Sequence, residues 1–144
     1  MKTARKMNVE GNLYVDYTCI NCDTCLWMCP STFSKVGAKV GVISQPTTPA
    51  EKLLAYAAMV ACPVGAINVY QPDPLMFEAL DLFPMLIDPE RLPNVYHCGY
   101  HSQTTFGGIP YFIKRDRGNV MIDNPRYTAR YSKQLKVSFP KNTF

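Results

Sequence analysis

The chain lacks any apolar run that approaches the roughly 18 residues needed to span a membrane. We expect no secretory leader, because the basic segment at residues 1–6 is followed by no apolar stretch. Disulfide frameworks belong mainly to small secreted proteins, so the six cysteines are not expected to pair with one another. We therefore expect a soluble protein, or one peripheral to a membrane, with no transmembrane segment.

The cysteines form a dense motif. Cys19, Cys22 and Cys25 have the spacing C-x2-C-x2-C, and Cys62 stands far along the chain, directly before Pro63. This arrangement is typical of iron–sulfur proteins, in which each thiolate binds a different iron of a cubane and a remote Cys-Pro supplies the fourth thiolate. A zinc site would favour two separated C-x2-C pairs, and the three cysteines of one loop do not fit that pattern.

The number of cysteines limits the number of clusters. Two [4Fe–4S] clusters would need eight thiolates, so six cysteines predict one cluster. The predicted ligands are Cys19, Cys22, Cys25 and Cys62. Cys29 completes the bacterial run C-x2-C-x2-C-x3-C-P and is either a spare thiol or an alternative fourth ligand. A [3Fe–4S] centre needs fewer thiolates, but the presence of Cys22 favours the full cubane. Cys98 is expected to be a buried apolar thiol.

Residues 8–70 have the pattern of a ferredoxin-like α+β domain. The sequence predicts strands over 13–18, 39–44 and 66–70, and a short helical turn over 26–28. A capping box at residues 48–51 opens a helix that delivers Cys62. The apolar face of this helix is expected to hold Leu53, Leu54, Ala57, Ala58 and Ala61.

Two features beside the cysteines concern the cluster environment. Gly65 and Ala66 should let the backbone approach the cluster, where amide N–H groups can donate to sulfur. Trp27 either shields the cluster from water or is an ordinary core aromatic.

A second unit follows a proline-rich connector. Residues 71–93 contain five prolines and are expected to hold one short helix near 75–82. Residues 94–135 should form a partial β unit that includes a hairpin around Gly118, followed by a basic helix from residue 127. Residues 136–144 are expected to be a polar tail.

The charge is distributed unevenly along the chain. Residues 7–113 carry four basic side chains against nine acidic ones, whereas residues 114–144 carry eight basic side chains against two acidic ones. An acidic cysteine-bearing half and a basic end offer opposite surfaces that can steer docking to a protein partner. No nucleic-acid partner is expected.

Four segments together resemble a known family. VDYTCINCDTCLWM, ACPVGAI, NVYHCGYHSQTTFGG and GNVMIDNPRY stand in the order found in the ferredoxin-fused metallo-β-lactamase-fold proteins of cyanobacteria, algae and plants. The resemblance covers about residues 8–135. It implies that the same four cysteines hold the cluster, that Cys29 is extra, and that residues 94–135 begin a metallo-β-lactamase-like sandwich. It also implies the chloroplast stroma or the cyanobacterial cytoplasm.

The hydrolase part of that family needs a histidine-rich metal motif, which is absent here. His97 and His101 are the only histidines, and a structural role is expected for them rather than a metal site with Cys98. The chain therefore resembles a product truncated early in the hydrolase-like domain, and we expect no enzyme activity from it alone.

Two classes of function follow. The first is a [4Fe–4S] electron carrier, or an electron-relay or accessory subunit of a larger redox complex, for example a photosynthetic one. The second is a structural or docking protein in which the cluster staples the fold, or a truncated hydrolase-family product without activity. An incomplete sandwich should leave an unpaired sheet edge for a partner, unless the hairpin folds back on the cysteine-bearing half.

Overall fold

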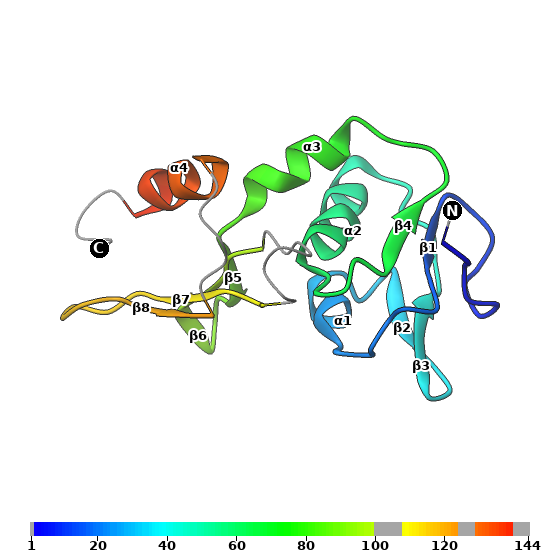
Figure 1. Cartoon of the computed structure of the whole chain (residues 1–144), viewed down its shortest axis with the longest axis horizontal. Coiled ribbons are helices and arrows are strands. Elements are labelled where there is room, and N and C mark those ends of the chain that lie inside the picture. Colours follow the sequence, from blue (N-terminus) through cyan, green and yellow to red (C-terminus); the bar gives the residue numbers. More distant parts are fainter. Residues whose placement is uncertain (1, 100–107, 124–128, 140–144) are drawn as a thin grey trace.

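The computed structural model describes residues 2–99, 108–123 and 129–139, and Figure 1 shows them as two lobes. One lobe carries the cysteine motif, and the other carries a four-stranded sheet and the last helix. Both lobes contain helices and strands, so the predicted mixed α+β class is confirmed. No helix within the described ranges is both long enough and apolar enough to cross a membrane.

The cysteine lobe consists of two small sheets and two helices. Its elements are β1 (Leu13–Val15), α1 (Thr24–Met28), β2 (Phe33–Val36), β3 (Lys39–Val42), α2 (Pro49–Ala61) and β4 (Ile67–Val69). β1 pairs with β4, and β2 pairs with β3, both antiparallel. Both helices pack together, and the core of the lobe lies between them and the sheets. This arrangement matches the predicted order of elements except for β2.

Sequence analysis did not predict β2, which forms a tight hairpin with β3. A two-residue loop joins Val36 to Lys39, and its first residue, Gly37, has φ 64°. A type II′ turn requires a positive φ at that position, and glycine adopts it without steric cost. Gly37 was therefore the signal in the sequence that could have revealed the hairpin.

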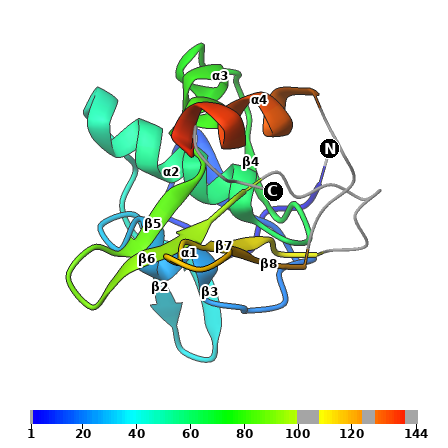
Figure 2. The same cartoon turned by 90° about the vertical axis from the view of Figure 1, so that its left-hand side faces the viewer.

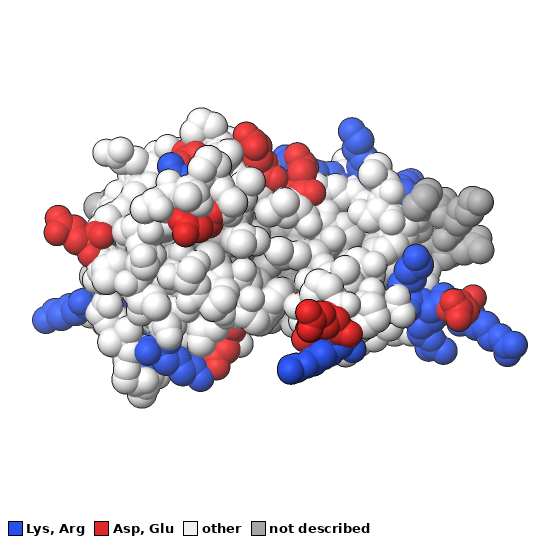
Figure 3. All heavy atoms as spheres, turned by 180° about the vertical axis from the view of Figure 1, so that it is seen from behind, with Lys and Arg blue, Asp and Glu red and all other residues white. Residues whose placement is uncertain are grey.

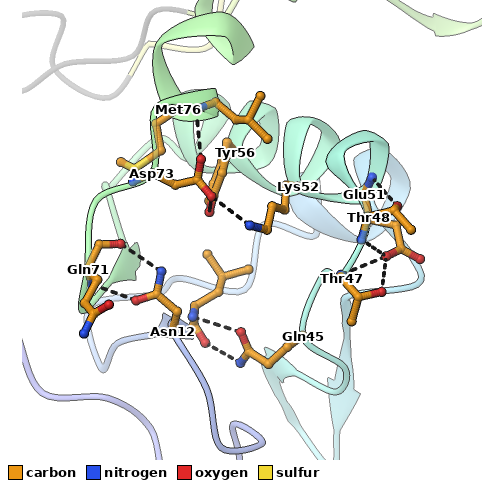
Figure 4. Close-up of polar contacts among 12 residues, drawn as sticks. Asn12, Gln45, Thr47, Thr48, Glu51, Lys52, Tyr56, Gln71, Asp73 and Met76 are labelled. Carbon is orange, nitrogen blue, oxygen red and sulfur yellow. Dashed lines mark hydrogen bonds and ion pairs between the residues drawn. The ribbon is translucent and has the colours of Figure 1, made fainter.

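The predicted capping box of α2 is confirmed (Figure 4). The Thr48 hydroxyl accepts from the backbone N–H of Glu51 at 3.2 Å, and the Glu51 carboxylate accepts from the backbone N–H of Thr48 at 3.0 Å. The predicted apolar face is only partly right, because Leu54 is 37% exposed. The buried face is instead rich in small side chains and consists of Ala55, Tyr56, Ala57, Ala58 and Ala61. These alanines let α2 approach its neighbours closely, while Leu53 packs at the edge of the core and Leu54 faces solvent.

Side-chain amides extend the pairing beyond the short strands of this lobe (Figure 4). Asn12 donates to the carbonyl of Gln71 at 2.8 Å and accepts from its N–H at 2.7 Å. Gln45 makes the same two-way contact with the backbone of Leu13, at 2.9 and 3.0 Å. Each amide satisfies a donor and an acceptor that short strands would otherwise leave unpaired.

The second lobe is an antiparallel sheet in the order β5-β6-β7-β8. Its elements are β5 (Met85–Asp88), β6 (Leu92–His97), β7 (Tyr111–Ile113), β8 (Val120–Ile122) and α4 (Ala129–Ser138). The chain reaches it through α3 (Leu75–Ala79), which packs on α2, and a 3₁₀ turn η1 (Leu80–Leu82). The predicted short helix and the predicted β7–β8 hairpin are both present. β5 was not predicted, because its four residues stand between Pro84 and Pro89 and become a strand only by pairing with β6.

Helix α4 covers one face of this sheet (Figures 1 and 2). Tyr131, Leu135 and Phe139 pack in one buried cluster with Cys98 and Phe112. The helix continues to Ser138, so the predicted polar tail, residues 136–144, begins as helix, and residues 140–144 lie outside the described part of the chain. The role predicted for Cys98, a buried apolar thiol, is confirmed.

Candidate functional site

The four predicted ligand cysteines come from three neighbouring segments. Cys19 and Cys22 stand on the loop between β1 and α1, Cys25 lies in α1, and Cys62 caps the C-terminus of α2. Two residues of the loop, Asn21 and Asp23, have φ of 55° and 62°. This left-handed backbone, which asparagine and aspartate tolerate better than most residues, curls the loop tightly between the cysteines.

The structure brings these four cysteines to one cavity. Its polar lining includes Cys19, Cys22, Cys25 and Cys62. The remaining walls are mainly apolar and include Val15, Ile20, Val40, Ala58, Val64 and Ile67. Thiols within apolar walls are the surroundings that iron–sulfur clusters require, because burial and ligand chemistry together stabilise the cluster.

Cys29, the fourth cysteine of the run, does not line this cavity. Cys29 is 1% exposed, and its sulfur lies 3.7 Å from the hydroxyl of Ser31. Its N–H donates to the carbonyl of Cys25, so the residue ends α1 through its backbone.

The four cysteines of the cavity differ in their exposure to solvent. Cys25 and Cys62 are each 8% exposed, whereas Cys22 is exposed and Cys19 is half-buried. Two apolar side chains of the same segment, Tyr17 and the cavity-lining Ile20, are about 60% exposed. A group held here would be enclosed by the core and would still have one edge near solvent.

The cysteines influence one another electrostatically. Burial, followed by the neighbouring Cys19, Cys62 and Cys22 in that order, raises the pKa of Cys25 to about 12. The thiol is therefore protonated at neutral pH in the absence of a cation. Because thiolates are the ligands, iron binding at this site must release protons.

Backbone amides donate to two of the sulfurs. The N–H of Asn21 lies 3.4 Å from the sulfur of Cys19, and the N–H of Ala66 lies 3.2 Å from the sulfur of Cys62. Gly65, at φ 58°, makes the turn that brings Ala66 back to this sulfur. The predicted donation of an amide N–H to sulfur is thus observed at Ala66.

A comparison with protein families agrees with this geometry. Residues 15–69 match the family model described as the 4Fe-4S single cluster domain of Ferredoxin I. The chain contains a ferredoxin-like iron–sulfur domain. The matched residues include all four cysteines of the cavity as well as Cys29. No curated protein and no solved structure matched the chain.

The cavity of the ferredoxin-like domain differs from a site for a single ion. Within the described ranges, no three His, Cys, Asp or Glu side chains are arranged to hold one metal ion. In a cubane each thiolate binds a different iron, so the sulfurs surround the cluster and do not converge on a point. Four thiols, apolar walls and N–H donors to sulfur together fit a [4Fe–4S] group.

Three further residues were considered for the site from the sequence, namely His97, His101 and Trp27. His97 is 1% exposed in the sheet of the second lobe, and it accepts the N–H of Gly99 through Nδ1 at 3.0 Å. His101 lies outside the described residues. Trp27 is 37% exposed and contacts the ring of His97, so it is neither fully buried nor among the residues that line the cavity.

Sequence analysis missed Arg5 as a residue of this site. The residue is 5% exposed, and its guanidinium binds the loop that carries the first two cysteines. The sequence shows it only as one of three basic residues near the start of the chain, a composition that usually marks a solvated segment.

Proposed function

We propose that the chain is a one-electron carrier, or an electron-relay subunit of a larger redox complex, built on a single [4Fe–4S] cluster. The proposed ligands are Cys19, Cys22, Cys25 and Cys62. When bound, such a cluster accepts and returns one electron at a time. The chain itself would enclose the cluster, donate N–H groups to its ligand sulfurs and keep one edge near the surface.

The observation that carries this proposal is the graded exposure of the four thiols around one cavity. Cys25 and Cys62 lie in the core, while Cys22 reaches the surface. Electron exchange with another protein requires the cluster to lie close to the protein surface, and the exposed Cys22 meets this requirement. The exposed Tyr17 and Ile20 beside it provide apolar area that a partner can cover.

A second candidate function is a structural one, in which the cluster staples the fold. It is supported by the origin of the ligands, since Cys19, Cys25 and Cys62 come from three different segments of a small lobe. Domains of this size often depend on a metal or another cross-link. The two functions differ in the expected redox behaviour: a staple need not be reversibly reducible, whereas a carrier must be.

The partner and the compartment remain proposals that rest on the family resemblance. It supports a redox complex at the stromal face of a photosynthetic membrane, or its cyanobacterial counterpart, with no hydrolase activity from this chain alone. Charge supports an electrostatically steered encounter, because Lys and Arg gather at the end formed by the β7–β8 hairpin and α4 (Figure 3). From the same resemblance we propose that residues 94–135 correspond to the start of a metallo-β-lactamase-like sandwich.

Iron and acid-labile sulfide analysis, with EPR of the reduced protein, tests the proposed function on anaerobically purified samples. We expect four irons and four sulfides per chain and a reversible one-electron signal. Cys62→Ser should lose or convert the centre, whereas Cys29→Ser, the matched control at a buried cysteine outside the cavity, should keep it. Retention in Cys62→Ser together with loss in Cys29→Ser would refute the ligand assignment, and a centre that cannot be reduced reversibly would favour the staple.

A further inference from the structure

Arg5 is a buried cation with no carboxylate partner among the described residues. Its side chain is 5% exposed, and none of the ion pairs formed by residues of the described ranges includes it. An arginine side chain keeps its positive charge in proteins, and burying a charge is costly unless another charge or several dipoles compensate for it. The environment of Arg5 therefore needs an explanation.

The contacts of Arg5 all point to the wall of the cysteine cavity. Nη2 donates to the carbonyl of Cys19 at 2.7 Å, and Nη1 donates to the carbonyl of Val40 at 3.0 Å. Nη1 also donates to the side-chain oxygen of Asn21 at 3.1 Å. Cys19 and Val40 line the cavity, and the N–H of Asn21 donates to the sulfur of Cys19. The guanidinium thus lies directly behind the loop that presents the first thiol.

These carbonyl and amide oxygens solvate the guanidinium but do not neutralise its charge. The nearby buried carboxylate, Asp16, is engaged by Lys2, Thr18 and Asn68 instead. The chemical group that would supply negative charge at this wall is the ligated cluster. Four thiolates outweigh the positive charge of an iron–sulfur core, so the assembly is an anion, and reduction adds one more negative charge.

We infer that Arg5 is the counter-ion of the cluster and that its buried charge raises the reduction potential by favouring the reduced state. The inference rests on the proposed single cluster. It follows from Coulomb's law, since a fixed positive charge in a poorly solvated wall stabilises an added electron more than the same charge in water does. Net charge and hydrogen bonding around a cluster are recognised determinants of its potential.

Lys6 provides a matched control for the charge of Arg5. It is the next residue along the chain, carries the same charge and is exposed. Replacing Lys6 by methionine removes one positive charge that is adjacent to Arg5 in the sequence. This charge is in contact with solvent, which screens it. A difference between Arg5→Met and Lys6→Met therefore reports burial of the charge and not the net charge of the chain.

The experiment is a redox titration of the cluster-loaded full chain, followed by EPR and visible absorbance. For Arg5→Met we expect the ratio of reduced to oxidised cluster at a fixed potential to fall about tenfold, which equals about 59 mV for one electron. Arg5→Lys keeps the charge but loses most of the hydrogen bonds that the guanidinium donates. The midpoint potential of this variant should therefore stay close to that of the wild type. Lys6→Met should leave the midpoint nearly unchanged.

Two outcomes would overturn the inference. If Arg5→Met and Lys6→Met shift the midpoint equally, the buried charge has no special role. If Arg5→Lys shifts it as far as Arg5→Met, Arg5 acts only by positioning the loop through hydrogen bonds.

The same variants remain informative if a neutral residue at position 5 prevents cluster binding. Loss of iron from Arg5→Met and Arg5→Gln but not from Arg5→Lys would still support the charge pairing, because the charge separates these variants. Loss from Arg5→Lys as well would contradict it. The iron and sulfide content of the wild type distinguishes failure of the proposed function from failure of the role of Arg5. A wild-type chain without a cluster refutes the proposed function. A wild type that holds the cluster, with a midpoint potential that Arg5→Met does not change, refutes only the role of Arg5.

Discussion

The rings of Trp27 and His97 lie 5.9 Å apart, centroid to centroid, and join the two lobes. Trp27 stands in α1, two residues after Cys25, and His97 ends β6. Tyr111, paired with His97 in the sheet, lies close enough to Cys22 for that cysteine to contribute, after burial, to its raised pKa. The sheet of the second lobe therefore approaches the cysteine loop. Sequence analysis considered such an arrangement as the alternative to an open sheet edge, with the β7–β8 hairpin folded back on the cysteine-bearing half.

This contact makes Trp27 a natural reporter of the cluster. It is the only tryptophan of the chain, so the tryptophan fluorescence has a single source. Iron–sulfur clusters absorb across the near-ultraviolet and visible range, and we expect loading with iron and sulfide to quench most of the emission. Fluorescence followed during reconstitution measures this. Cys62→Ser should show little quenching under the same conditions, and equal quenching in that variant would contradict the location of the cluster.

Protonation of His97 should destabilise the fold. Burial lowers the pKa of His97 from its ordinary value of 6.5 to about 4, so the unfolded chain takes up this proton before the folded chain does. The free energy of unfolding is therefore unaffected by His97 above pH 6.5, the pKa in the unfolded chain. It falls as the pH decreases from 6.5 towards 4, the pKa in the folded chain. Between about pH 7.5 and about pH 5.5 we expect His97 to cost about 1.4 kcal/mol. Urea unfolding of His97→Phe should lack this loss.

A control for that measurement is His101→Phe. The two residues are the only histidines, so the His101 variant retains the titration of His97 and no other histidine. It should therefore still lose stability as His97 takes up its proton, whereas His97→Phe should not. Parallel profiles for the two variants would contradict the role of His97.

The capping box should stabilise α2 measurably. Thr48→Ala removes the acceptor for the N–H of Glu51, and loss of such a cap costs about 1 kcal/mol. Thr47→Ala removes only a hydroxyl contact to the same carboxylate and should cost less. Thermal or urea unfolding compares the two variants. Equal losses would show that the helix start does not depend on Thr48.

Glu51 should also make the helix start sensitive to acid. Hydrogen bonds from the backbone N–H groups of Thr48 and Thr47, in that order, lower its pKa to about 2. Because the folded pKa is depressed, the stabilisation is present above the unfolded pKa and is lost as the pH falls through about 2. Glu51→Gln should be less stable at neutral pH and should approach the wild type in acid. A constant difference across this range would argue against the carboxylate contact.

Removal of the cluster should destabilise the cysteine lobe. The cavity lies within its core and is bordered by β1, the cysteine loop, α1 and the end of α2. Without ligated iron, four thiols and their apolar surroundings lose the group that holds these segments together. Far-UV circular dichroism and thermal melting before and after anaerobic iron chelation measure the effect. An unchanged spectrum and midpoint would show that the lobe folds without a cluster.

Several features of this protein could be predicted because neighbouring residues decide them. The spacing of Cys19, Cys22 and Cys25 allows one loop to present three thiols, whatever the rest of the chain does. The capping box at Thr48 and Glu51 depends on two side chains one helical turn apart, and the structure contains both of its hydrogen bonds. Composition and periodicity placed most strands and helices, although their observed ends differ by a few residues.

The tertiary structure alone decided which groups are buried and which edges pair. β5 is a strand because β6 lies beside it, and Leu54 is exposed because the alanines of α2 form the closest contact. Arg5 looks like a solvated residue in the sequence, yet backbone carbonyls from Cys19 and Val40 enclose its charge. Such outcomes depend on contacts between residues far apart in the chain, and the free energy of burying a side chain or a charge is set by those contacts and not by its neighbours in sequence.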